Sequence, residues 1–105
     1  SILKLLANKI LPKPGHGPSK NNRENGYYNL KFYIKTNDNK EMIARVIGDM
    51  DPGYGSTSKM LAESAVCLAK DDLKESYGIL TPSTAMGELL LNRLQENAGL
   101  SFKFE

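Results

Sequence analysis

The stretch from Asp49 to Ala65 constrains the fold more than any other, because it reads as a rigid turn that leads directly into a helix. Pro52 fixes one backbone φ angle, and Gly53 and Gly55 permit conformations that other residues rarely adopt, so the chain can reverse sharply before the helix begins. The first turn of a helix has free backbone N–H groups, which attract anions. The pattern therefore allows a phosphate or carboxylate site at the start of this helix.

This turn supplies all our candidates for substrate or anion binding: Asp51, Gly53, Tyr54, Gly55, Ser56, Thr57 and Lys59. We expect Ser56 or Thr57 to cap the helix and Lys59 to meet the anion. The stretch lacks the spacing of a phosphate-binding P-loop, and Ser58 stands where a dinucleotide fingerprint needs its third glycine. The alternative interpretation is a tight turn whose glycines serve backbone geometry alone.

The rest of the sequence offers little catalytic chemistry. His16 is the only histidine, so a histidine-based metal cluster or a Ser-His-Asp triad cannot form within the chain, and we expect no metal site. Cys67 lies in an apolar stretch without activating cations nearby, which favours a buried structural thiol. The catalytic residues stay unknown at this stage.

Charge and cysteine content narrow the class of protein. The 105 residues include 14 basic and 12 acidic side chains, and a net charge of +2 is too small for the strong positive field that nucleic-acid binding needs. A single cysteine excludes an internal disulfide and favours an intracellular, cytoplasmic location. No apolar run reaches the roughly 20 residues that cross a bilayer.

Hydrophobic periodicity predicts an α+β fold with a small antiparallel sheet covered by two helices. The helix after the turn, rich in apolar and small residues, should be buried on most of its circumference and cross the apolar face of a hairpin. The segment from Pro12 to Asn25, rich in Pro, Gly and polar residues, should be an irregular connector. The expected elements are a short helix over residues 2–11, a hairpin with strands at about 28–36 and 41–48, helices at about 56–71 and 82–97, and a C-terminal strand at about 101–105.

Four blocks resemble, in order, the last part of saccharopine-dehydrogenase-like oxidoreductases, a family also described as trans-acting enoyl reductases. The blocks are Pro14–Ser19, Arg23–Tyr28, Asp51–Ala69 and Gly78–Gly87, and the likeness covers about residues 12–105. Members of that family are several times longer and bind NAD(P) in an N-terminal Rossmann domain, for which this sequence has no GxGxxG motif. The resemblance therefore implies a C-terminal domain at residues 12–105, and residues 1–11 as a helix or link to a missing preceding domain.

Two hypotheses follow from these observations. In the first, the chain is the substrate-side or oligomerisation domain of a larger NAD(P)-dependent oxidoreductase, is inactive by itself, and has the missing Rossmann domain of the same chain as its partner. A homo-oligomer or peripheral membrane association of the parent protein is compatible with this hypothesis. In the second, the chain is a free-standing interaction or small-anion-binding module that uses the helix start from Gly53 to Lys59.

Overall fold

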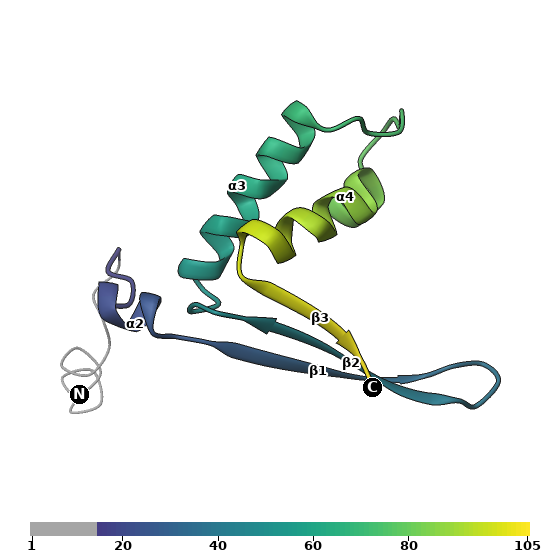
Figure 1. Ribbon diagram of the computed structural model, residues 1–105, viewed down its shortest axis with the longest axis horizontal. Helices are drawn as coiled ribbons and strands as arrows, with labels where there is room; N and C mark the ends of the chain where they lie inside the picture. Colours follow the sequence, from purple (N-terminus) through teal and green to yellow (C-terminus); the bar gives the residue numbers. More distant parts are fainter. Residues whose placement is uncertain (1–14) are drawn as a thin grey trace, which may run out of the picture.

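Alternating apolar and polar residues, followed by two segments of helical period, produce the predicted α+β architecture (Figure 1). The computed structural model describes residues 15–105, so the helix predicted at residues 2–11 lies outside the described residues. Both predicted helices and all three predicted strands are present, with boundaries that differ from expectation by at most one residue. In chain order the elements are α2 (Lys20–Glu24), β1 (Tyr28–Lys35), β2 (Glu41–Gly48), α3 (Gly55–Lys70), α4 (Pro82–Asn97) and β3 (Leu100–Phe104).

The three strands form an antiparallel sheet in the order β1-β2-β3. Tyr28 pairs with Gly48 and Lys35 with Glu41 across the hairpin, and β3 pairs with the second half of β2 from Ala44 onward. Since side chains alternate across a strand, this register gathers most apolar residues of the three strands on one face, while Ile43 and Ile47 lie on the other. The turn at residues 36–40 projects beyond the end of β3 (Figure 1).

Helices α3 and α4 form an antiparallel pair with a small core of its own. Cys67, Met86 and Leu90 are buried between them, and Leu73, Ala85 and Leu94 pack around this cluster. Thr81 caps α4 by accepting a hydrogen bond from the Thr84 backbone N–H, and Pro82 occupies the first helical position as the sequence predicts. The pair reaches the sheet through α4, which leads into β3.

The prediction that residues 12–25 form an irregular connector was wrong in its last part, where α2 makes one short helix over Lys20–Glu24. Ser19 caps this helix by accepting a hydrogen bond from the Asn22 backbone N–H at 3.2 Å. At the other end the Asn25 side chain donates to the Asn21 carbonyl oxygen at 3.0 Å. Polar side chains that favour turns also cap helices, and here the capping function prevails.

The expectation that α3 is buried on most of its circumference and crosses the hairpin was also wrong. α3 packs on α4 and rises away from the sheet (Figure 1). Leu61 is 71% exposed and Leu68 is 60% exposed, whereas Cys67 is fully buried. Only the side of α3 that carries Cys67 packs against other elements within residues 15–105. The apolar residues on its other sides therefore stay exposed.

Candidate functional site

Asp51 organises the turn that precedes α3. Its carboxylate accepts hydrogen bonds from the backbone N–H groups of Gly53 at 3.1 Å, Tyr54 at 3.3 Å and Gly55 at 2.6 Å. The bond from Gly55 is the main reason why the pKa of Asp51 lies below its usual range, and the bonds from Tyr54 and Gly53 add to it. The donors that an external anion would use are thus occupied by a carboxylate of the chain itself.

The hydroxyl groups near the start of α3 do not cap it, contrary to the prediction for Ser56 or Thr57. Ser56 is fully buried, and its Oγ lies 2.8 Å from the hydroxyl of Tyr28 in β1. Thr57 donates to the Pro52 carbonyl oxygen at 2.7 Å. The Asp51 side chain accepts hydrogen bonds from the free N–H groups instead. The capping residue therefore lies earlier in the sequence than Ser56 or Thr57.

Lys59 lies on the first turns of α3 but faces another acidic residue. Its Nζ is 3.0 Å from Oδ1 and 3.1 Å from Oδ2 of Asp49. Gly99, the second residue after α4, has a φ of +69° and passes so close to the Asp49 carboxylate that a Cβ would overlap it. The Lys59–Asp49 pair therefore ties α3 to the loop after β2, beside the start of β3.

A cavity of about 300 Å³ lies between α2 and the beginning of α3. Of the seven predicted site residues, Tyr54 and Gly55 line it, while the other five hold the turn or face elsewhere. Gly17 lies against the Tyr54 ring, where an added Cβ would come within 3.2 Å of ring carbons. The lining residues are Lys20, Arg23, Glu24, Met50, Tyr54, Gly55 and Ser58.

Two cationic residues in this cavity, Lys20 and Arg23, were missed by the sequence analysis. They are three residues apart on α2, and that spacing places them on one face of a helix. The signal was present in Ser19, a residue type that favours the helix N-cap, followed by a short polar run. Lys20 also lies 3.7 Å from Glu24 in an exposed ion pair, so Arg23 is the cation available to meet a ligand.

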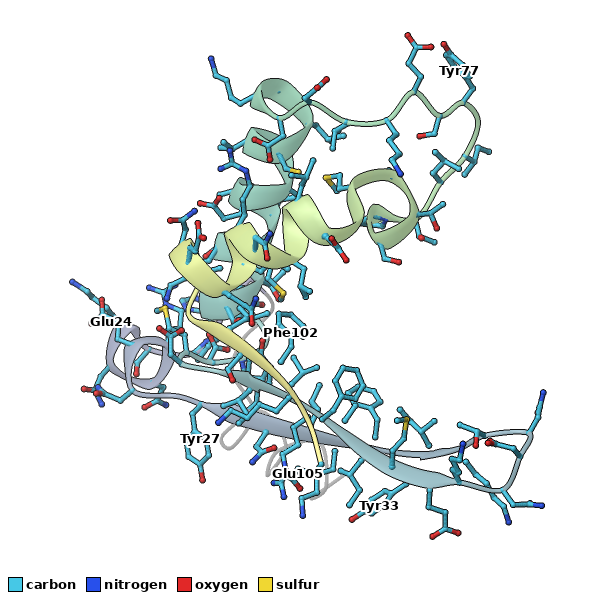
Figure 2. All side chains as sticks on the ribbon, turned by 45° about the vertical axis from the view of Figure 1, so that its right-hand side comes forward. Glu24, Tyr27, Tyr33, Tyr77, Phe102 and Glu105 are labelled. Carbon is cyan, nitrogen blue, oxygen red and sulfur yellow. The ribbon has the colours of Figure 1, made fainter. Side chains whose placement is uncertain are left out.

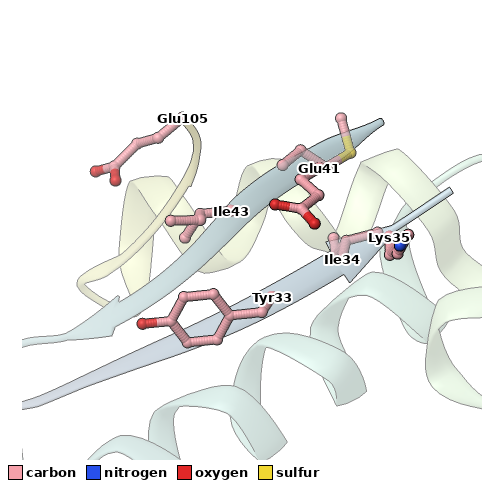
Figure 3. Close-up of a pocket in the computed structure, with 7 residues that line it drawn as sticks. Tyr33, Ile34, Lys35, Glu41, Ile43 and Glu105 are labelled. Carbon is pink, nitrogen blue, oxygen red and sulfur yellow. The ribbon is translucent and has the colours of Figure 1, made fainter. Parts of the chain in front are cut away.

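A second, larger hollow of about 550 Å³ lies at the far end of the hairpin (Figure 3). Its lining mixes apolar, aromatic and charged side chains from both strands, together with the chain end after β3. Arg45 holds Glu105 there, with 2.7 Å between Nε and Oε1, and this contact lowers the pKa of Glu105. The lining residues are Tyr33, Ile34, Lys35, Glu41, Met42, Ile43 and Glu105.

A network of charged groups links the two long helices. Arg93 on α4 binds Asp71 at the end of α3 through two contacts of 2.6 Å and reaches Glu63 at 3.3 Å. Arg93 lowers the pKa of Asp71 to about 2. Burial, followed by the hydrogen bond with Asp71, raises the pKa of the Cys67 thiol, as expected for an unreactive cysteine.

The remaining expectations concern metals and membranes. Within residues 15–105 no group of three or more His, Cys, Asp and Glu side chains could hold a metal ion, and His16 lies exposed in the loop before α2. In the same part of the chain, the helices are too short or too polar to cross a bilayer.

Comparison with known proteins shows similarity to one group of enzymes. A Mycobacterium tuberculosis protein named "Putative trans-acting enoyl reductase" is 44% identical over 100 residues, which make up 93% of this chain and 24% of that protein. The "Trans-acting enoyl reductase" of Mycobacterium ulcerans is 41% identical over 90 residues, covering 84% of this chain and 21% of the relative. This chain is homologous to one segment of the trans-acting enoyl reductases.

A third relative gives the same result: the "Trans-acting enoyl reductase" of Mycobacterium bovis is 41% identical over 91 residues, which cover 85% of this chain and 22% of that protein. The chain thus spans about a quarter of the length of the curated relatives it matches. No family model matches the chain, and no solved structure matches it.

Proposed function

We propose that this chain is the C-terminal, substrate-side or oligomerisation domain of a larger NAD(P)-dependent oxidoreductase of the saccharopine-dehydrogenase-like type. The observation that carries the proposal is the identity of 44% over 93% of the chain with a protein four times as long that is named as an enoyl reductase. The cofactor-binding domain lies in the part of the longer protein that has no counterpart here. Enoyl reduction transfers hydride from the nicotinamide to an activated carbon–carbon double bond, and the cofactor carries that chemistry.

The architecture of the chain supports a role other than cofactor binding. The glycine-containing turn into α3, at Asp51 to Gly55, is closed by an internal carboxylate, and a dinucleotide pyrophosphate needs free N–H groups at such a turn. The sheet is antiparallel, whereas the open sheets that bind dinucleotides at a topological switch point are mostly parallel. The chain therefore contributes walls or contacts to the enzyme, and the nicotinamide binds elsewhere.

The proposal is tested by comparing the protein encoded by the complete gene with residues 1–105 alone. We expect the complete protein to oxidise NADH or NADPH in the presence of an enoyl thioester, and residues 1–105 to do neither this nor bind the nucleotide in a calorimetric titration. Tight binding of NADH by residues 1–105 would overturn the division of labour. A complete protein that never oxidises the cofactor with any enoyl thioester would overturn the proposed activity.

The cavity between α2 and α3 favours one second candidate, a small-anion-binding module. Arg23 and Lys20 line this cavity together with the first turn of α3, and a carboxylate or phosphate would fit their charge. The hydrogen bonds that the N–H groups of this turn donate to Asp51 oppose it, because an incoming anion would meet a carboxylate already in place. Titration with inorganic phosphate tests this second candidate. Binding that is lost in Arg23→Gln and kept in Lys59→Gln supports an anion-binding module centred on this cavity. Absence of phosphate binding rules this candidate out.

A further inference from the structure

The sheet has one face that carries no charged side chain. In the register of the strands, Leu30 lies opposite Val46, Phe32 opposite Ala44, and Ile34 opposite Met42. β3 continues the same face, since Val46 pairs with Phe102 and Ala44 with Phe104. We call this set the apolar sheet face: Leu30, Phe32, Ile34, Met42, Ala44, Val46, Phe102 and Phe104.

Half of the apolar sheet face is open to solvent within residues 15–105, and its other four residues are partly buried. Phe104 is 75% exposed, Leu30 50%, Phe32 48% and Met42 40%. Large apolar side chains present roughly 150–250 Å² each, so these two aromatic and two aliphatic residues together expose on the order of 400 Å² of apolar surface. A patch of this size equals the largest one on a typical monomer, which is often functional.

The two long helices lie over only one end of this face. Phe102 points to the side where α4 lies, whereas Tyr27, Tyr33 and Glu105 point to the opposite side (Figure 2). The hairpin formed by β1 and β2 extends beyond the C-terminal end of β3 and past the helices (Figure 1). The Cα radius of gyration is 18.3 Å, against about 13 Å for a compact domain of 100 residues. The chain therefore holds its apolar surface apart instead of closing it into one core.

The opposite face and the outer edge of β1 have a different character. The opposite face carries Lys31, Lys35, Arg45 and Lys103 beside Tyr33 and the partly buried Ile43 and Ile47, and this mixture of charged and apolar side chains matches an ordinary wet surface. Lysines along an edge strand discourage a further strand from pairing there. The apolar sheet face, not the edge and not the charged face, is thus the surface that requires a partner.

We infer that the apolar sheet face docks on an uncharged, apolar surface of another part of the same, longer polypeptide. This inference rests on the proposed function, under which three quarters of the protein lie outside this chain, as they do in the relatives. A charged partner would lose its hydration against Phe32 and Phe104 with no counter-charge in return. A covalently joined partner acts at millimolar effective concentration, which a second copy of the chain does not reach at ordinary protein concentrations.

The test uses the complete protein and the adjacent residues Phe32 and Tyr33, which face opposite sides of the sheet. Phe32→Cys and Tyr33→Cys are each introduced into the complete protein in a Cys67→Ala background. Maleimide labelling of the introduced cysteine is followed by peptide mass spectrometry, and its rates are compared in native buffer and in urea. We expect position 32 to be protected about 100-fold more than position 33, because labelling at position 32 requires the docked surface to open. Equal protection at the two positions would overturn the inference.

Two further measurements separate the alternatives. Phe104→Cys reports on the same face at its periphery and should show the same protection, which guards against a failure of Phe32→Cys to fold. Protection that disappears when the protein is diluted to a monomer identifies a second copy as the partner and overturns the intrachain contact. Reductase activity is measured on the same samples, so an active protein with a reactive position 32 refutes the docking alone, and a protected but inactive protein refutes the proposed function alone.

Discussion

Arg93, within α4, binds Asp71, directly after α3, through a paired contact, with 2.6 Å from Nε to Oδ2 and 2.6 Å from Nη2 to Oδ1. Both side chains are largely shielded, at 24% and 16% exposure. Such a fork geometry fixes orientation as well as distance. The apolar cluster of Cys67, Met86 and Leu90 between the helices is small. The angle between α3 and α4 therefore depends on the Arg93–Asp71 pair as well as on this cluster.

Acid should release this contact within a defined pH range. The pKa of Asp71 is about 2 in the folded chain, below the ordinary value of 3.8. Because the folded-state pKa is the lower one, the stabilisation is fully present above the ordinary pKa and is lost as the pH falls through about 2. We expect the free energy of unfolding, measured by urea titration, to fall over this range, and Asp71→Asn to flatten the fall. An equally steep fall in Asp71→Asn would contradict the assignment.

The hydrogen bond between Tyr28 and Ser56 should hold the start of α3 on the sheet. Ser56 is fully buried, so Tyr28→Phe leaves its hydroxyl without a partner, and we expect a loss of about 1–3 kcal/mol in the free energy of unfolding. Ser56→Ala should cost less, because Tyr28 is only half-buried and its hydroxyl can turn to water. A double-mutant cycle should give a coupling energy of about 1 kcal/mol.

Tyr33→Phe is the matched control for this cycle, since its ring is 75% exposed on the wet face of the same strand. It should change stability by less than about 0.5 kcal/mol. A coupling energy near zero for Tyr28 and Ser56 would show that the contact contributes nothing to the attachment of α3.

Gly87 interrupts α4 and should not tolerate a side chain. Its φ of 49° and ψ of −129° are not helical, although helical residues flank it on both sides. Alanine in a regular helix gains about 0.5–1 kcal/mol over glycine, but here the conformation is closed to alanine. We therefore expect Gly87→Ala to lower the free energy of unfolding by about 1 kcal/mol or more, measured against Gln95→Ala in the same helix. A stabilised Gly87→Ala protein would mean that α4 runs straight through.

The elements of the fold could be predicted from the sequence because their signals are local. Thr81 and Pro82 specify the start of α4, and alternation over residues 28–35 specifies β1. Packing could not be predicted, because periodicity shows which residues prefer burial but not what buries them. Leu61 and Leu68 are of a residue type that is common in protein cores, yet both lie exposed on α3. Their burial would require a partner beyond the helix itself.

The candidate site shows the same division. The turn from Asp51 to Gly55 and its proximity to a helix start were predicted, because proline and glycine act on the local backbone. That Asp51 itself occupies the N–H groups depends on the path of its side chain, which no spacing rule states. Arg23 also lines the cavity, although more than 25 residues separate it from this turn in the sequence. The two segments meet only in the folded chain, where the Asp51 N–H donates to the Arg23 carbonyl oxygen at 3.1 Å.

Cys67 should be unreactive in the native protein and become reactive when α3 and α4 separate. It is fully buried, and burial is the first cause of its raised pKa, ahead of the hydrogen bond with Asp71. We expect the thiol to react with an aromatic disulfide reagent about 100-fold more slowly in buffer than in urea, because reaction requires opening of the helix pair. Since burial outweighs the contact with Asp71, Asp71→Asn should speed the reaction less than urea does. Residues 1–105 contain one cysteine, so in this part of the protein the absorbance change reports Cys67 alone. Prompt labelling in buffer would show that the α3–α4 core is open in solution.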